Sequence, residues 1–286
     1  IRNQRGIGGI LYMKRNFIGF MSSHRTDEQE AMSANRPEVT DVAPKKSVVS
    51  VYFPEQHTTL SYYNDRFDLH KGDLVYVDGA LEGLRGLATA VSYTFKIKLS
   101  KYKKVVAVVD RNAAGTYYFA GSHLLTFDRE ALPFERVRTW FQAPVPEEEY
   151  AVGEGSGAFP LDAFEQIGFS YEIAERGKNY YAENRVCYLS VNGTQGKAIV
   201  SGHEYYTVEF TYKNGEISDL VCSCFCNYPC KHTFACILQL KECLGILAEN
   251  YADKADDYFA AISKGTWLEM VFNGQQTGKI RLYDEQ

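Results

Sequence analysis

The chain lacks a long uninterrupted apolar segment. Although 45% of its 286 residues are hydrophobic, no apolar run approaches the roughly 20 residues that a helix needs to cross a bilayer. The most apolar N-terminal stretch, Ile7 to Phe20, is broken by Lys14, Arg15 and Asn16, and no small-residue cleavage pattern follows it. These absences argue against a membrane anchor and a secretory signal. We therefore expect a cytoplasmic protein without membrane contact.

Sequence motifs of the common enzyme classes are also missing. The chain contains no GxxxxGK[ST] phosphate-binding loop, no GxSxG nucleophile elbow and no HExxH zinc-protease motif. Its carboxylates do not fall into a recognisable catalytic pattern. We therefore expect that the protein is not an enzyme.

The chain has no large excess of basic charge. Its 31 Lys and Arg residues and 36 Asp and Glu residues give a net charge of −5, which argues against coating nucleic acid with the whole surface. A local excess lies between Arg66 and Arg111, where nine basic residues face five acidic ones. Five of the nine are clustered as candidate nucleic-acid-binding residues: Lys96, Lys98, Lys101, Lys103 and Lys104.

Two interpretations of these lysines remain open. Because side chains alternate along a strand, Lys96 and Lys98 would share one face, with Tyr93 or Phe95 nearby to stack on bases. Lysines on an exposed sheet edge also suppress aggregation, so a solvated edge explains the same pattern.

Aromatic residues are plentiful, with 21 Tyr and 17 Phe. They occur in short segments bounded by Gly, Asn and Asp, which is typical of strands. The length exceeds that of a usual single domain. We expect an α+β protein with a disordered leader (1–46), a β-rich domain (47–141), a linker rich in Pro, Gly and Glu (142–160), a cysteine-rich domain (161–250) and a C-terminal extension with a short helix and a β-hairpin (251–286).

Within the β-rich domain, the segment Lys71 to Gly86 carries glycines at 72, 79, 83 and 86. Glycine permits the positive φ angles of tight turns between strands. This segment resembles the opening of KOW or SH3-like barrels. The resemblance implies a small β-barrel in the N-terminal half.

Five of the seven cysteines fall between Cys222 and Cys236. Such clustering is typical of a metal site rather than of a disulfide framework. A CxC pair and a CxH pair supply soft and borderline ligands in the number that tetrahedral zinc requires. Cys226 forms a second CxC with Cys224. Two ligand sets therefore remain open, one with Cys222 and one with Cys226 in its place.

The pattern CxC, short loop, CxH followed by an apolar helix resembles the SWIM-type zinc finger. The preceding Arg-Gly-Lys-Asn-Tyr-Tyr at 176–181 is similar to the segment that leads into such fingers, and the resemblance covers about Phe164 to Leu247. It implies a β-hairpin and helix finger that binds Zn²⁺, with DNA, RNA or a protein as partner. The ligands that it implies are Cys222, Cys224, Cys230 and His232.

Taken together, these features predict a zinc-binding, non-enzymatic module that binds nucleic acid, DNA rather than RNA, through a basic barrel surface. The alternative is a protein-interaction module with a structural zinc site.

Overall fold

The computed structural model describes residues 44–144, 153, 155–226, 229–254, 256–273 and 278–284. The expected leader, residues 1–46, lies outside the described residues except for its last three positions. Helices and strands both occur in the described part, as expected for an α+β protein, and the strands form two sheets.

The first sheet holds five strands in the order β2-β1-β4-β3-β5. Its core consists of alternating residues such as Val49, Val51 and Phe53, as the two-residue period of a strand requires. The strands are β1 (Ser47–Phe53), β2 (Thr58–Asn64), β3 (Leu74–Val77), β4 (Gly86–Ser92) and β5 (Val105–Val108).

This sheet is not the closed barrel that we expected. Its end strands, β2 and β5, form no ladder with each other, and a single parallel bridge joins Tyr63 to Lys104. β5 is only four residues long, because the lysine-rich segment before it forms a loop instead of extending the strand. The glycine pattern correctly marks turns, since Gly72, Gly79 and Gly83 have positive φ angles.

The second sheet holds nine strands in the order β14-β6-β7-β13-β9-β10-β11-β12-β8. All its neighbouring strands are antiparallel except β14 and β6, which are parallel. The strands are β6 (Gly115–Ala120), β7 (His123–Thr126), β8 (Phe159–Pro160), β9 (Val186–Asn192), β10 (Gln195–Ser201), β11 (Tyr205–Lys213), β12 (Glu216–Cys222), β13 (Tyr258–Ser263) and β14 (Ile280–Tyr283).

The larger sheet combines segments that we expected to be separate. β6 and β7 fall within 47–141, yet β7 pairs with β13 in this sheet. The segment 251–286, expected as a C-terminal extension with a short helix and a β-hairpin, contributes α5 and the strands β13 and β14, and β13 lies between β7 and β9. All six residues of β13 are buried, as in a central strand. Of the expected linker, 159–160 form β8, and 145–152 and 154 lie outside the described residues.

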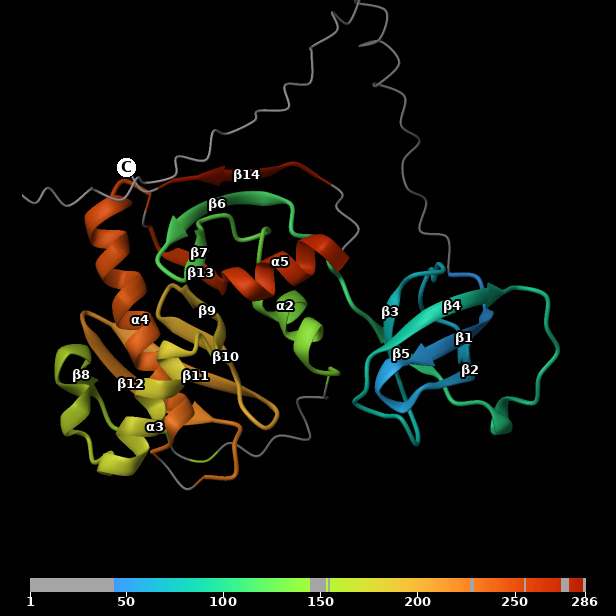
Figure 1. The fold of residues 1–286 in the computed structure, drawn as a ribbon, viewed down its shortest axis with the longest axis horizontal. Coiled ribbons are helices and arrows are strands. Elements are labelled where there is room, and N and C mark those ends of the chain that lie inside the picture. Colours follow the sequence, from blue (N-terminus) through green and yellow to red (C-terminus); the bar gives the residue numbers. More distant parts are fainter. Residues whose placement is uncertain are drawn as a thin grey trace, which may run out of the picture. The chain divides into compact units, whose positions relative to one another are not determined.

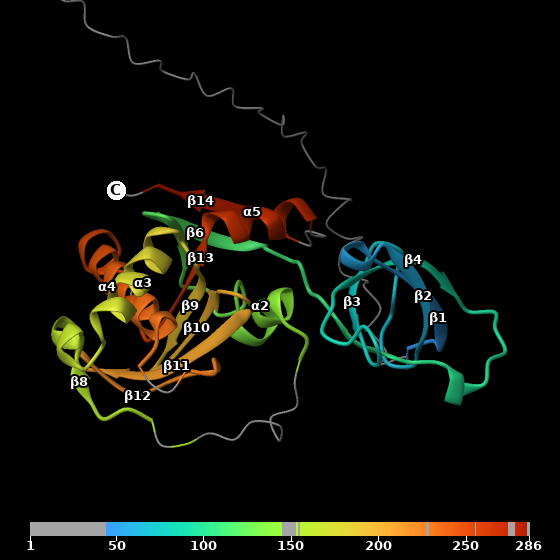
Figure 2. The same cartoon turned by 60° about the horizontal axis from the view of Figure 1, so that its bottom comes forward.

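Helices cover both faces of the larger sheet (Figures 1 and 2). On one face, α4 (Lys231–Asn250) packs through Phe234, Ile237 and Leu240 in one buried cluster with residues of β9 to β12, and α3 (Tyr171–Ala182) lies beside it. On the other face, α2 (Phe134–Phe141) and α5 (Lys264–Asn273) contribute Trp140 and Trp267 to a second cluster. Short 3-10 helices cover Pro54–Gln56, Leu99–Lys101 and Leu161–Gln166.

Candidate metal centre

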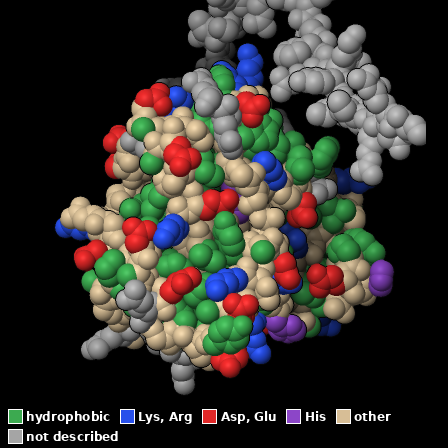
Figure 3. All heavy atoms as spheres, turned by 60° about the vertical axis from the view of Figure 1, so that its left-hand side comes forward, with side chains coloured by type: hydrophobic (Ala, Val, Ile, Leu, Met, Phe, Trp, Pro, Cys, Tyr) green, Lys and Arg blue, Asp and Glu red, His purple; other side chains and the backbone are tan. Residues whose placement is uncertain are grey.

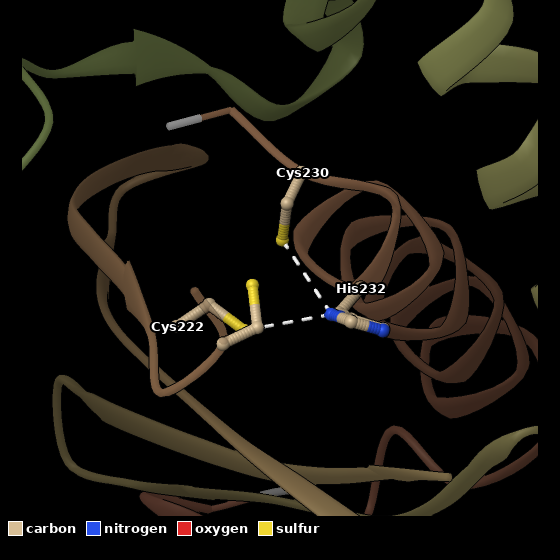
Figure 4. Close-up of side chains that lie close together, drawn as sticks. Cys222, Cys230 and His232 are labelled. Carbon is tan, nitrogen blue, oxygen red and sulfur yellow. Dashed lines mark hydrogen bonds between the residues drawn. The ribbon is translucent and has the colours of Figure 1, made fainter. Parts of the chain in front are cut away.

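Three sulfur atoms and one imidazole converge where β12 meets α4. β12 ends at Cys222, Cys224 lies in the segment that follows, Cys230 is the N-cap of α4, and His232 is in its first turn. The ligand atoms of these four residues all lie within 4.8 Å of one another. Figure 4 shows Cys222, Cys230 and His232 pointing toward a common centre. The four residues that the SWIM resemblance implies as ligands are thus brought together.

Two sulfur–nitrogen separations are close to those expected around a tetrahedral zinc ion. His232 Nδ1 lies 3.8 Å from Cys222 Sγ and 3.8 Å from Cys230 Sγ. With ordinary Zn–S and Zn–N bond lengths, a tetrahedral zinc ion places a sulfur and a nitrogen ligand roughly 3.6 Å apart. The donor set and its geometry therefore fit a zinc ion with little movement of the side chains.

The N-terminus of α4 holds Cys230 in place. Thr233 N donates to Cys230 Sγ at 3.4 Å, while Cys230 N donates to Thr233 Oγ1 at 3.2 Å. This reciprocal arrangement is a capping box with a cysteine at the N-cap, and it satisfies two amide groups that the helix leaves unpaired. The helix cap and the candidate metal ligand are therefore the same side chain.

The end of β12 holds the other pair of cysteines. Cys222 pairs with Val208 of β11 in the last step of the ladder. Beyond it, Thr207 and Ser223 exchange two hydrogen bonds of 2.9 Å, one through the Ser223 hydroxyl. The amides of Cys224 and Cys226 also bond the sulfurs of Cys222 and Cys224, respectively. The chain reversal after Cys222 is thus fixed by backbone contacts.

Two tyrosines frame the imidazole of His232. The Tyr206 ring stacks on it with centroids 4.3 Å apart, and the Tyr180 ring is tilted against it at 5.5 Å. A Cβ at Gly202 would lie 3.2 Å from His232 Nε2 and 2.8 Å from the Tyr206 ring. Lys231 lies over the Tyr180 ring at 4.6 Å. His232 is 3% exposed, so its orientation is set by packing.

The three thiols differ in acidity. Hydrogen bonds from Cys222, His232 and Thr233 lower the pKa of Cys230 to about 3. The pKa of Cys222 is strongly raised because its thiol is hydrogen-bonded to Cys230 and is largely buried. Burial raises the pKa of Cys224 to about 11. Cys230 is therefore the one thiol of the three whose pKa is lowered, while the pKa values of Cys222 and Cys224 are raised.

The other cysteines lie apart from this group. Cys226, the alternative ligand left open by the sequence, is exposed and does not belong to the converging set. Cys236 and Cys243 are buried in the cluster beneath α4, where they pack as small apolar residues. The geometry therefore favours Cys222 as the fourth ligand.

The candidate nucleic-acid residues lie in a loop rather than on a strand. β4 ends at Ser92, whose hydroxyl donates to the Thr94 carbonyl, so the strand alternation that we expected for Lys96 and Lys98 is wrong. A 3-10 helix covers Leu99–Lys101. All five lysine side chains are exposed.

Both ends of this loop are attached to Tyr63. The Phe95 ring packs edge-on against Tyr63 at 6.2 Å, and Tyr63 N donates to the Lys103 carbonyl at 2.8 Å. Lys104 Nζ lies 5.8 Å from the Tyr63 ring centroid and pairs with Asp65 at 2.9 Å. Residues 96–102, which we call the cationic loop, therefore project from a closed base.

The lysines of the cationic loop are available for binding. Within the described part of the chain, Lys96, Lys98 and Lys101 form no ion pair, whereas Lys104 is committed to Asp65. Leu99, between them, is 58% exposed.

The surface on the side of α4 has a different character. In Figure 3, basic, acidic and apolar side chains are interspersed over this face.

The described residues include no helix long and apolar enough to span a membrane.

Sequence reasoning missed the residues that support the ligands. Thr233 follows Cys230 by three positions, which is the spacing of a capping box, but cysteine is not one of the usual N-cap residues. Tyr206 lies far along the chain from His232, and only the ladder between β11 and β12 brings it to the site.

Comparison of the chain with protein-family models, with curated proteins and with solved structures found no match.

Proposed function

We propose that this chain is a zinc-binding, non-enzymatic module of the SWIM type that acts in the reducing cytoplasm. The observation that carries the metal assignment is the convergence of three sulfurs and one imidazole within 4.8 Å. Four protein ligands fill a tetrahedral site, so water and substrate have no open position at the metal. The zinc therefore has a structural role.

Metal analysis of the purified protein tests this assignment. We expect about one zinc per chain, retained in Cys226→Ser and lost in Cys222→Ser. The two substitutions are matched in chemistry and lie four residues apart. Zinc lost from the Cys226 variant but kept in the Cys222 variant would refute our choice of ligands, and reduced protein without any metal would refute the site.

We propose further that the cationic loop binds nucleic acid, with DNA preferred to RNA. The unpaired ammonium groups of Lys96, Lys98 and Lys101 support this proposal, because lysine–phosphate contacts release counterions and drive association. Tyr93 is 50% exposed and precedes the loop, where its ring is open to stacking on a base. Lys103 and Lys104 belong to the base of the loop and are expected to contribute less.

A titration of labelled duplex DNA, duplex RNA and single-stranded DNA over a salt series tests the loop. Changing Lys96, Lys98 and Lys101 to Gln should weaken binding and lower the salt slope by up to about 2.7, since each phosphate contact contributes roughly 0.9. The matched control changes the exposed Lys45, Lys71 and Lys213 to Gln. An equal loss of nucleic-acid affinity in both variants would show that binding depends only on the total charge of the protein.

A protein-interaction module is the second candidate, and Phe225 favours it. This side chain lies next to the ligand Cys224 and is 98% exposed, and a rigid exposed aromatic ring is a common anchor in protein interfaces. A partner protein that co-purifies at high salt with the parent chain, but not with Phe225→Ala, would support this candidate. The zinc content of that variant should remain unchanged.

A further inference from the structure

The four sheet edges of the described residues differ in how they are protected. β8 consists of two residues and ends at Pro160, which has no N–H to donate. β2 and β5 are joined by the bridge between Tyr63 and Lys104. β14 has four residues and no proline or lysine, it pairs on one side only, and within the described residues no bridge joins it to another sheet edge. Edges of this kind are prone to pair with another strand.

The apolar side chains of β14 are unusually exposed. Leu282 is 45% exposed and Tyr283 is 48% exposed, although Tyr283 stacks on Tyr118 with centroids 5.3 Å apart. Figures 1 and 2 both show β14 running along β6 at the end of the larger sheet. Another strand laid beside β14 would cover these side chains and satisfy its outward backbone groups.

The pairing of β14 with β6 determines which backbone groups face outward. Gly115 N donates to the Lys279 carbonyl, and Ile280 is opposite Gly115 in the parallel register. The N–H and C=O of one strand residue point to the same side, and this side alternates along the strand. Residues 279, 281 and 283 therefore face β6, while 280, 282 and 284 present their backbone groups to the outside.

We propose that β14 pairs with β14 of a second copy of this chain, antiparallel and around a two-fold axis at Leu282. In an antiparallel ladder, outward-facing residues must be opposite each other. This leaves a register with Leu282 opposite Leu282, and Ile280 opposite Asp284. It also places Arg281 opposite Tyr283 twice, once on each side of the axis.

The register with Leu282 opposite Leu282 brings complementary side chains together, whereas the registers shifted in either direction along the strand do not. Arg281 and Tyr283 would meet in a non-hydrogen-bonded pair with Cα atoms about 4.5 Å apart, close enough for a cation–π contact. A shift in one direction would place Arg281 opposite Arg281, which is unfavourable for like charges. A shift in the other direction would leave Ile280 and Arg281 without partners among the described residues. The register with Leu282 opposite Leu282 therefore pairs every described residue from 280 to 284.

Sedimentation analysis in reducing buffer tests the proposal. The pairing surface is small compared with stable interfaces, so we expect the average mass to rise from 32.4 kDa toward twice that value between about 10 and 500 µM. Leu282→Arg would place two arginines at the axis and should abolish the rise. Leu60→Arg is the matched control, since Leu60 is also on an edge strand and is 44% exposed. It should dimerise like the parent chain.

Cross-linking provides a second measurement that does not depend on a disruptive variant. In a Cys226→Ser background, Leu282→Cys should form an interchain disulfide under mild oxidation, because residues opposite each other lie about 5.5 Å apart. Ile280→Cys, opposite Asp284, should not. A chain that stays monomeric up to 500 µM, or one whose dimer survives Leu282→Arg unchanged, would overturn the proposal. A monomer that instead takes up an added extended peptide on this edge would overturn it as well.

Discussion

Removing the metal should open the segment between β12 and α4 without detaching α4 from the sheet. In classical zinc-finger peptides the metal contributes about 10–16 kcal/mol and the chain unfolds without it. Here α4 also buries Phe234, Ile237, Leu240 and Leu247, each at most 4% exposed. Burying four such side chains stabilises the helix by roughly 6–12 kcal/mol in total, as an upper bound. The apolar contacts of α4 are therefore expected to hold it in place.

Removal of the metal is expected to change the structure only locally and to lower the stability moderately. A ligand that binds only the folded state at 100 to 1,000 times its dissociation constant contributes about 2.7–4.1 kcal/mol. For a domain of this size, each kcal/mol corresponds to about 2–4 °C in Tm. Chelation should therefore lower the Tm by about 5–15 °C and leave a cooperative transition.

Hydrogen exchange read by mass spectrometry, with and without chelator and with reductant in both samples, locates the change. Amide protection should fall in Cys222–Cys226 and Cys230–His232, and it should persist in residues 234–247 and in β9 to β11. His232→Ala should reproduce this pattern without chelator. If exchange instead rises along the whole of α4, the apolar cluster does not hold the helix alone, and our estimate is wrong.

Three further predictions follow from the site and the fold. The pKa values of Cys222 and Cys224 are raised, while that of Cys230 is about 3. Zinc binding near pH 7 should therefore displace two thiol protons, and the zinc affinity should rise about 100-fold for each unit by which the pH increases. Calorimetry in buffers of different ionisation enthalpy measures the number of protons released. Gly202→Ala should crowd His232 and Tyr206 and weaken zinc binding about 10-fold or more in a competition titration with a chelator, whereas Gly245→Ala, with open space around it, should leave the affinity unchanged. Truncation after Tyr251 removes β13 from the centre of the larger sheet and should abolish cooperative unfolding. A truncated chain that unfolds like the parent would contradict the observed strand order.

The two pairs of candidate ligands could be recognised in the sequence because each pair lies within three residues of chain. Cys222 with Cys224 and Cys230 with His232 are local patterns whose spacing alone limits the chemistry. The choice between Cys222 and Cys226 could not be made in this way, since both form a CxC with Cys224. It depends on where β12 ends, and the ladder with β11 places Cys222 in the strand and leaves Cys226 exposed.

The strand segments were predictable, but their membership in a sheet was not. The runs around β6 and β7 read as strands, and their assignment to the N-terminal domain followed only from their position in the chain. β7 pairs with β13, more than 130 residues further on, and β6 pairs with β14. Such long-range pairing leaves no local signal in residue alternation. Residue alternation also gave the wrong prediction for the cationic loop. Its alternating Lys and apolar residues have the pattern of a strand, but β4 ends at Ser92, where the chain turns.

The position of the candidate metal centre suggests what a bound metal ion would do for the fold. β12 pairs with β11 along its length, but on its other side β8 reaches only Glu216 and Ile217. The end of β12 that carries Cys222 therefore has no strand on its outer side within the described residues. Bonds from one metal ion to Cys222 at this end and to Cys230 and His232 of α4 would fasten the strand to the helix that spans the sheet. A metal ion bound at this site would thus replace the strand pairing that β12 lacks at its Cys222 end.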